Sequence, residues 1–172
     1  MTTSELYSSV EPAPDNSKVK LCWYVGAYQD TDITEYFLEE GGIWENGYDD
    51  KYIDLVNSIQ IGDKIAIKSS YNQQKNLPFD AGNKKVSVMA VKAIGTVTKN
   101  YGNGKKLNVE WEKLDNPKKW FLFRSMLTVW KVESQPDDWR YQALLDFTFA
   151  DKPQDYEQFL HHSHRGGEIW NS

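Results

Sequence analysis

The chain has 172 residues, a formal net charge of -5 and 40% hydrophobic residues, a size and balance typical of one soluble domain with its own core. Its only cysteine, Cys22, lies in an apolar run, which favours a buried thiol and excludes a disulfide or a cysteine-based zinc site within the chain. No stretch has the pattern of a signal peptide or of a membrane span, so we expect a cytoplasmic protein with no membrane partner.

Charge is unevenly distributed along the chain. Residues 64–131 carry 14 basic and 4 acidic side chains, whereas residues 1–63 carry 3 and 13. Aromatic residues are numerous, with 7 Trp, 10 Tyr and 7 Phe, and several alternate with the lysines of the basic block. Lysines bind phosphates and aromatic rings stack on bases, so this block suits a nucleic acid. The alternative is that the same lysines keep strand faces and sheet edges soluble, and composition leaves both open.

The first third of the chain predicts one strand and two short helices. Residues 1–18 have little apolar content and are expected to be disordered. Residues 20–28 are rich in aromatic and β-branched side chains, which predicts a buried strand. Asp32 is a candidate N-cap for a helix that ends at 41–42, and apolar spacing predicts a second helix over 52–59.

The rest of the chain predicts four strands and a long helix. A hairpin turn at 100–104 joins the second of these strands to the third, and Gly95 indicates a bulge or bend. Taken together, five or six strands with helices early and late predict an α+β fold with a barrel-like sheet over residues 19–160, followed by a tail over 161–172. The predicted strands are 64–68, 86–98, 107–111 and 126–132, the helix is 139–149, and a last helical turn is expected over 155–161.

Trp44 is the first candidate for a functional residue. It lies in a glycine-rich run at 41–47, which predicts a connection between elements and not a strand. A large ring on such a connection is suited to a pocket for a flat ligand. The alternative is a core tryptophan that seals one end of the sheet.

Motifs for catalysis are weak. The run Gly-Asn-Gly-Lys-Lys at 102–106 lacks the first glycine and the final Ser or Thr of a phosphate-binding P-loop, so a hairpin turn explains it better. The three histidines, at 161, 162 and 164, are expected in a polar tail and not in a metal site. Paired acidic residues are adjacent on polar turns, unlike catalytic carboxylates that converge from separate elements. We therefore expect no catalytic residues, no metal and no cofactor.

Three ordered motifs carry a family resemblance: Trp-Tyr-Val-Gly at 23–26, Gly-Ile-Trp-Glu at 42–45 and Gly-Asp-Lys-Ile-Ala-Ile-Lys at 62–68. Together with the segments 65–80 and 86–95, they resemble the EVE-type branch of the PUA-like superfamily, relatives of the YTH readers of methylated adenine. The chain looks most similar to the EVE-like modules that open the AAA+ GTPase subunit of McrBC-type, modification-dependent restriction systems. The likeness covers about residues 20–160.

The resemblance implies a PUA-like, partly closed β-barrel with flanking helices. Its implied function is a non-catalytic reader that binds a modified, typically methylated, base in DNA by flipping it out of the duplex into an aromatic cage. By position in the resemblance, Trp44 is one wall of the cage and Tyr28 lies at its mouth. The nature of the modification is not fixed by the sequence.

Further contacts to the base are expected from two segments. Lys68, Ser69 and Tyr71 follow a predicted strand and offer donors and an aromatic face. In the loop that follows, which also contains Asn76, Asp80 is a candidate acceptor for an exocyclic amine and Phe79 a candidate wedge for the gap left by flipping. Ordinary loop and turn roles are the alternative for each. The candidate phosphate contacts are Lys75, Lys84, Lys85, Lys105 and Lys106.

The implied partners are DNA carrying a modified base and, in a longer protein, a C-terminal AAA+ GTPase module with a separate nuclease subunit. A free-standing reader is the other arrangement that we consider. Two alternative functions remain open at this stage: an RNA-binding, PUA/YTH-like reader of modified RNA, and a protein-interaction domain with no nucleic-acid ligand.

Overall fold

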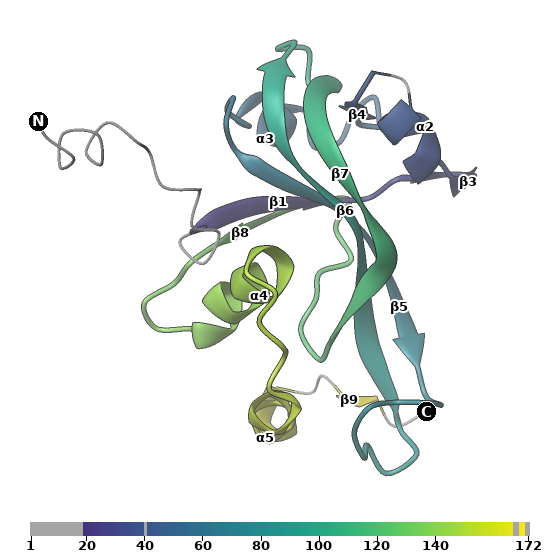
Figure 1. The fold of residues 1–172 in the computed structure, drawn as a ribbon, viewed down its shortest axis with the longest axis vertical. Helices are drawn as coiled ribbons and strands as arrows, with labels where there is room; N and C mark the ends of the chain where they lie inside the picture. The colour runs from purple at the N-terminus through teal and green to yellow at the C-terminus, as the bar shows by residue number, and fades with distance from the viewer. Residues whose placement is uncertain (1–18, 40, 167–168, 171–172) are drawn as a thin grey trace, which may run out of the picture.

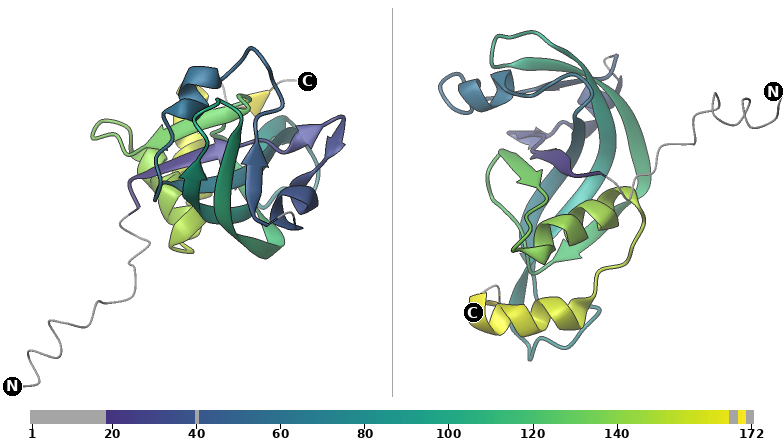
Figure 2. Two further views of the ribbon diagram at one scale, coloured as in Figure 1. Left: turned by 90° about the horizontal axis from the view of Figure 1, so that it is seen from above. Right: turned by 90° about the vertical axis from the view of Figure 1, so that its left-hand side faces the viewer.

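A computed structural model describes residues 19–39, 41–166 and 169–170, with side chains as far as residue 162. The lead-in expected over 1–18 lies outside these residues. A curled β-sheet forms the centre of the described chain (Figures 1 and 2). Its strands are hydrogen-bonded in the order β4-β7-β6-β5-β1-β8, and the short β9 pairs with the start of β6. They are β1 (Leu21–Val25), β4 (Ile43–Glu45), β5 (Lys64–Gln73), β6 (Lys85–Asn100), β7 (Lys106–Phe121), β8 (Val129–Glu133) and β9 (Ile169–Trp170).

The sheet is a half-open barrel. Within the described residues its strand path ends at β4 on one side and β8 on the other, without closing. β1 and β5 are parallel, and the remaining neighbours in the path are antiparallel. A separate two-stranded hairpin, β2 (Tyr28–Gln29) and β3 (Thr31–Asp32), follows β1. The expected α+β fold with a curled, partly open sheet is therefore confirmed at this level.

Four helices are described, two near each end of the long strands. Figure 1 shows α2 and α3 beside the upper part of the sheet and α4 and α5 beside its lower part. No helix among the described residues is long and apolar enough to cross a membrane. The helices are α2 (Thr34–Glu39), α3 (Ile53–Asn57), α4 (Trp139–Phe149) and α5 (Tyr156–Gly166).

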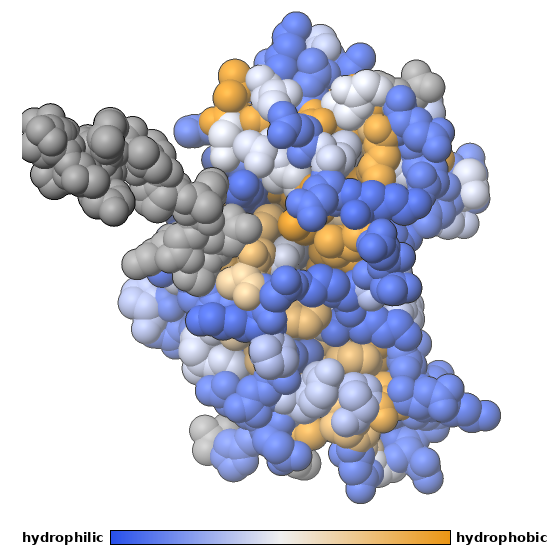
Figure 3. All heavy atoms as spheres, in the orientation of Figure 1, coloured by the Kyte–Doolittle hydropathy of each residue, from blue (hydrophilic) through white to orange (hydrophobic). Residues whose placement is uncertain are grey.

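Two hydrophobic cores lie on opposite faces of β1. Cys22 and Tyr24 belong to the core that contains α4 and α5, whereas Trp23 and Val25 belong to the core that contains α2 and α3. This division follows from the strand itself, because successive side chains point to opposite faces. Burial of Cys22 agrees with its place in an apolar run. On the face drawn in Figure 3, hydrophilic residues cover most of the surface, and hydrophobic residues show in smaller patches among them.

β6 and β7 are long enough to contribute to both cores. Their register jumps between the pairs Val91↔Lys118 and Ala93↔Lys113, so β7 residues 114–117 bulge out of the ladder. Pro117 lies in this bulge, where its missing N–H removes no ladder bond. The strand expected over 107–111 is therefore only the first part of β7, and the polar composition of the bulge hides its continuation to Phe121.

Several predicted elements are confirmed. The helix expected over 139–149 coincides with α4, and the strands expected over 64–68 and 86–98 lie within β5 and β6.

Gly95 does not form the bulge that the sequence indicated, because it is not at a register shift. It allows β7 to approach, because a Cβ there would lie 2.6 Å from the Glu110 carbonyl oxygen. The last helical turn expected over 155–161 is longer than one turn, since α5 runs from Tyr156 to Gly166.

Trp44 lies within a strand, which corrects the expectation of a connection. It is the central residue of β4 and pairs with Leu107 of β7. The glycine before this strand, Gly42, has a positive φ of 77° and a Cβ there would lie 2.3 Å from the Val109 carbonyl oxygen. Gly42 therefore allows close approach to β7 and does not indicate a flexible connection.

Candidate functional site

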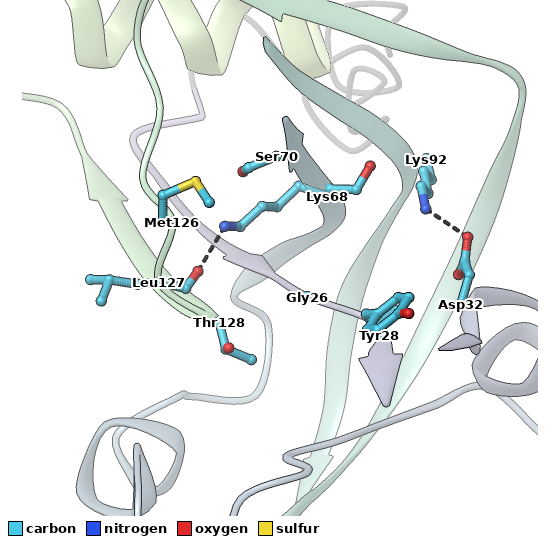
Figure 4. A pocket seen from close by; sticks show the side chains of 11 residues that line it. Gly26, Tyr28, Asp32, Lys68, Ser70, Lys92, Met126, Leu127 and Thr128 are labelled. Atoms are coloured by element: carbon cyan, nitrogen blue, oxygen red, sulfur yellow. Dashed lines mark hydrogen bonds and ion pairs between the residues drawn. The ribbon is translucent and has the colours of Figure 1, made fainter. Parts of the chain in front are cut away.

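A cavity of about 240 Å³ opens where β1 and β5 diverge. It is lined by residues 26–28 after β1, residues 68–70 of β5 and residues 126–128 before β8, together with Asp32 and Lys92. These segments are far apart in sequence and meet only because β1 lies between β5 and β8 in the sheet. Figure 4 shows the lining side chains converging from these separate segments.

The cavity forms because the parallel pairing of β1 with β5 ends while β5 continues. The β1–β5 register runs as far as Val25↔Ile67. Beyond that point β5 continues beside β6 with a register shift between Ile67 and Lys68, and the chain after β1 turns away toward β2. Gly26 fixes this turn, since its N–H donates to the Thr128 carbonyl over 2.8 Å.

Lys68 forms the floor of the cavity. Its side chain is buried, and Nζ donates to the carbonyl oxygens of Ser125 at 2.8 Å and Leu127 at 2.7 Å. Burial, together with the positive charge of Arg124, lowers the pKa of Lys68 to about 8. An ammonium group has three donors, so these two bonds leave one donor for a ligand.

The segment before β8, residues 122–128, is held in place by hydrogen bonds from the cavity lining and from Tyr52 beside the core with α2 and α3. Ser70 Oγ donates to the same Ser125 carbonyl at 3.2 Å, and the Tyr52 hydroxyl accepts from the Thr128 N–H at 3.2 Å. Within the segment, the Leu127 N–H donates to Ser125 Oγ at 3.1 Å. We call residues 122–128 the rim loop. Its backbone is fixed by polar contacts that point inward.

Three apolar side chains remain exposed around the buried ammonium. Tyr28 is 74% exposed, Met126 68% and Leu127 50%. Tyr28 comes from the chain after β1, and the other two come from the rim loop, so the mouth of the cavity is apolar on two sides. In Figure 4 Met126 and Leu127 project from opposite sides of the rim loop.

An ion pair closes a further side of the cavity. Lys92 Nζ of β6 lies 2.7 Å from Asp32 Oδ2 at the end of β3. Burial disfavours the charged Asp32 carboxylate, but hydrogen bonds from Lys92 and Thr34 outweigh it and lower the pKa of Asp32 to about 2. The Asp32 carboxylate therefore stays charged over the physiological pH range.

The arrangement is suited to a small planar group with polar edges. The volume of the cavity is below the roughly 300–1,000 Å³ typical of pockets for drug-sized ligands. The apolar rim offers faces for stacking, while Lys68 supplies a donor and Ser69 and Ser70 lie beside it on β5. A flat ring that carries an oxygen or nitrogen acceptor satisfies both kinds of contact.

Three of the expected base-binding residues meet in this cavity: Tyr28, Lys68 and Ser69. Trp44 does not line it, which corrects its expected place as a wall. The Trp44 side chain is fully buried in the core with α2 and α3. Its Nε1 donates to the Gly26 carbonyl oxygen over 2.8 Å, so it supports the cavity from behind.

The other four expected residues do not line the cavity. Tyr71 lies further along β5, half-exposed, with its carbonyl bound by Arg124. Asn76 and Asp80 belong to the loop between β5 and β6, which lies at the bottom of Figure 1, and Asp80 accepts from the Gly82 N–H as a turn residue. Phe79, in the same loop, packs on the core with its ring centroid 5.4 Å from that of Phe121.

The expected phosphate contacts fall into two groups at opposite ends of β6. Lys75, Lys84 and Lys85 lie at or beside the loop that precedes β6, and Lys105 and Lys106 follow the turn after it. β6 has 16 residues, which is about 50 Å of strand at about 3.3 Å per residue. The five lysines therefore do not form a single patch. Lys105 is also engaged with Asp49 at 2.8 Å.

Sequence reasoning missed several residues of the site. Asp32 was expected only as a helix cap, and it does accept from the Thr34 N–H at 2.9 Å, but it also faces the cavity. Met126 and Leu127 were placed in a strand that in fact begins at Val129. No local pattern distinguishes Lys92 from the other lysines of the basic block, because its role depends on contact with β3.

The histidines at 161 and 162 lie on α5 and line a different cavity, of about 270 Å³, with Trp139 and Gln158. Among residues with described side chains, no three His, Cys, Asp or Glu residues are grouped so as to hold a metal ion.

Comparison with known proteins does not identify the chain, since no protein-family model matches it and no significant match exists among curated proteins or solved structures.

Proposed function

We propose that this chain is a non-catalytic reader module that binds a modified base in DNA, with the base flipped out of the duplex into the cavity between β1 and β5. The observation that carries the proposal is the exposed apolar rim around a buried ammonium. In a modification-dependent restriction system such a module is the specificity domain, and GTP hydrolysis and cleavage belong to partner modules.

Flipping is the physical route by which so small a cavity can accept a base. A base inside the duplex exposes only its groove edges, whereas a flipped base presents both faces and its Watson–Crick edge. In our proposal Tyr28 stacks on one face of the base and Lys68 donates to an acceptor on its edge. Ser69 and Ser70 supply hydroxyl groups near the same edge. Tyr28 thus takes the stacking role that the sequence had suggested for Trp44.

Phosphate contacts are assigned to one end of the hairpin formed by β5 and β6. Lys75, Lys84 and Lys85 lie there, and none of them forms an ion pair with a described residue. Free lysines of this kind release counterions on binding DNA, which makes binding weaker as salt rises. Lys105 is left out of the assignment because it is bound to Asp49 and to the Tyr48 carbonyl.

The test is a binding screen with short DNA duplexes that each carry one modified base, compared with the plain duplex at the same salt concentration. We expect at least one modification to bind more tightly than the plain duplex. Tyr28→Ala should reduce that preference by about tenfold, as expected for loss of one stacking contact. Tyr101→Ala is the matched control, because Tyr101 is also exposed but lies at the turn between β6 and β7.

Three outcomes would contradict the proposal. If no modified duplex is preferred over the plain one, the chain is not a reader of modified DNA. If structured RNA competes more tightly than every duplex at matched salt, the ligand is RNA. Equal losses in Tyr28→Ala and Tyr101→Ala would place the base elsewhere on the surface.

A further inference from the structure

We propose that Met126 and Leu127 form a wedge that enters the DNA stack at the position vacated by the flipped base. This inference rests on the proposed function, because a wedge is needed only if the base leaves a duplex. It assigns to the rim loop a role that the sequence had suggested for Phe79.

Exposure of these two side chains is the first observation. Both are large and apolar, both are at least half exposed, and they are consecutive in the chain. They border the same cavity as Tyr28, so a base held against Tyr28 would leave its gap in the duplex close to them. Proteins that kink or open a duplex insert side chains of this type, including Leu and Met, between base steps.

Rigidity of the rim loop is the second observation. Lys68 binds two of its carbonyl groups, Ser70 binds one of the same two, and Tyr52 binds the N–H of Thr128. A wedge must hold its shape while it separates stacked bases, and a loop that is ordered before binding loses less entropy on binding. Lys68 is therefore both the floor of the cavity and a positioning residue for the wedge.

Phe79 is excluded as the wedge by its packing. Its ring centroid lies 5.4 Å from that of Phe121 and 5.2 Å from that of Tyr156, in edge-to-face and tilted contacts. Removing it from these contacts would open the core that contains α4 and α5. Met126 and Leu127 are not packed into the core in this way, since Met126 is 68% exposed and Leu127 is 50% exposed.

The experiment compares duplex and single-stranded DNA that carry the same modified base. Met126→Ala, Leu127→Ala and the double variant should bind the duplex more weakly, by roughly tenfold for the double variant, because the flipped state loses the group that fills its gap. Binding to the single strand should stay within about twofold of the wild type, since a single strand has no gap to fill. Ile61→Ala is the matched control, because Ile61 is about as exposed as Met126 but lies outside the cavity.

A second measurement reports on the stack itself. A duplex with 2-aminopurine next to the modified base becomes more fluorescent when the neighbouring base is unstacked. Wild type and Ile61→Ala should produce this increase, and the double variant should produce less of it at saturating protein. Tyr28→Ala should weaken binding to duplex and single strand alike, which separates the wall of the cavity from the wedge.

Failure of the wedge and failure of the proposed function give different results. Equal weakening of duplex and single-strand binding in the double variant would show that these residues contact the base. Unchanged duplex binding would show that they do not contact the DNA. Either result overturns the wedge and leaves the reader function intact. Wild-type protein that prefers no modified DNA, single-stranded or duplex, overturns both.

Discussion

The indole Nε1 of Trp44 donates to the carbonyl oxygen of Gly26 over 2.8 Å, and Gly26 lines the candidate cavity. This bond joins β4 at one edge of the sheet to the chain that leaves β1. A residue that forms no part of the cavity wall thus fixes the position of one that does.

Trp44→Phe should test this supporting role. The substitution keeps an aromatic ring in the core but leaves the Gly26 carbonyl without its donor, which we expect to cost about 1–3 kcal/mol of unfolding free energy. Trp44→Ala should cost more, about 3–5 kcal/mol, because it also leaves a cavity in the core. Denaturant unfolding of the three proteins measures both effects. A Trp44→Ala protein with unchanged stability and selective loss of base binding would instead favour the original cage role.

Lys68 should make the stability of the protein depend on alkaline pH. Its pKa is 10.5 when exposed and about 8 in the folded protein, so between these values the unfolded chain binds the proton and the folded chain does not. The unfolding free energy must then rise with pH in this window, and the full cost of burying the charge is present below about pH 8. Between pH 7 and pH 9.5 we expect a gain of about 2 kcal/mol relative to Lys68→Met.

The comparison with Lys68→Met is essential to that measurement. Burial also raises the pKa of the Cys22 thiol and of the Tyr24 hydroxyl well above their usual values, and these groups lower stability at high pH in both proteins. Taking the difference between the two unfolding curves removes this shared effect. A difference that stays constant from pH 7 to pH 9.5 would show that the Lys68 ammonium is not buried as described.

The sequence predicts those parts of the fold that depend on the pattern of neighbouring residues along the chain. Helix α4 has both helical spacing and a side-chain cap, since Asp138 accepts from the Arg140 N–H at 3.1 Å. Aromatic and β-branched content likewise identifies β1, and alternation identifies the start of β5. The continuation of β7 past Trp111 was missed because its side chains are mainly polar and exposed, and that stretch is held in the sheet by pairing with β6.

The site was predicted in part for a similar reason. Tyr28, Lys68 and Ser69 were found because each lies at or just after the end of a strand that the sequence predicts, and these strands prove to be neighbours. Trp44 was misplaced because its glycines indicate a connection locally, whereas β4 forms only by pairing with residues more than sixty positions away. Met126 and Leu127 were missed because their exposure depends on where β8 begins.

Gly95 and Gly26 offer a matched pair of substitutions. A Cβ on Gly95 would lie 2.6 Å from the Glu110 carbonyl oxygen, a backbone atom that cannot move without disturbing the β6–β7 ladder, so Gly95→Ala should cost about 1–3 kcal/mol. A Cβ on Gly26 would lie 3.6 Å from Thr128, an ordinary contact, and Gly26→Ala should cost far less. Thermal unfolding of both variants measures the difference. Similar losses for the two would contradict the close approach at Gly95.

Asp32 should link stability to acid pH. Its pKa in the folded protein is about 2, below the usual 3.8, so the unfolded carboxylate takes up its proton first as pH falls. The contribution of Asp32 to the unfolding free energy is therefore complete above about pH 4 and is lost as pH falls through about 2.

Asp32→Asn should remove this pH dependence while keeping an acceptor for the Thr34 N–H, and Lys92→Met should weaken it by removing the ion pair. Unfolding curves from pH 5 to pH 2 give the comparison, with Asp49→Asn as the control, because Asp49 also pairs with a lysine but lies in the connection between β4 and α3, outside the cavity lining. A wild-type curve that parallels that of Asp32→Asn over this range would show that the Asp32–Lys92 pair does not stabilise the mouth of the cavity.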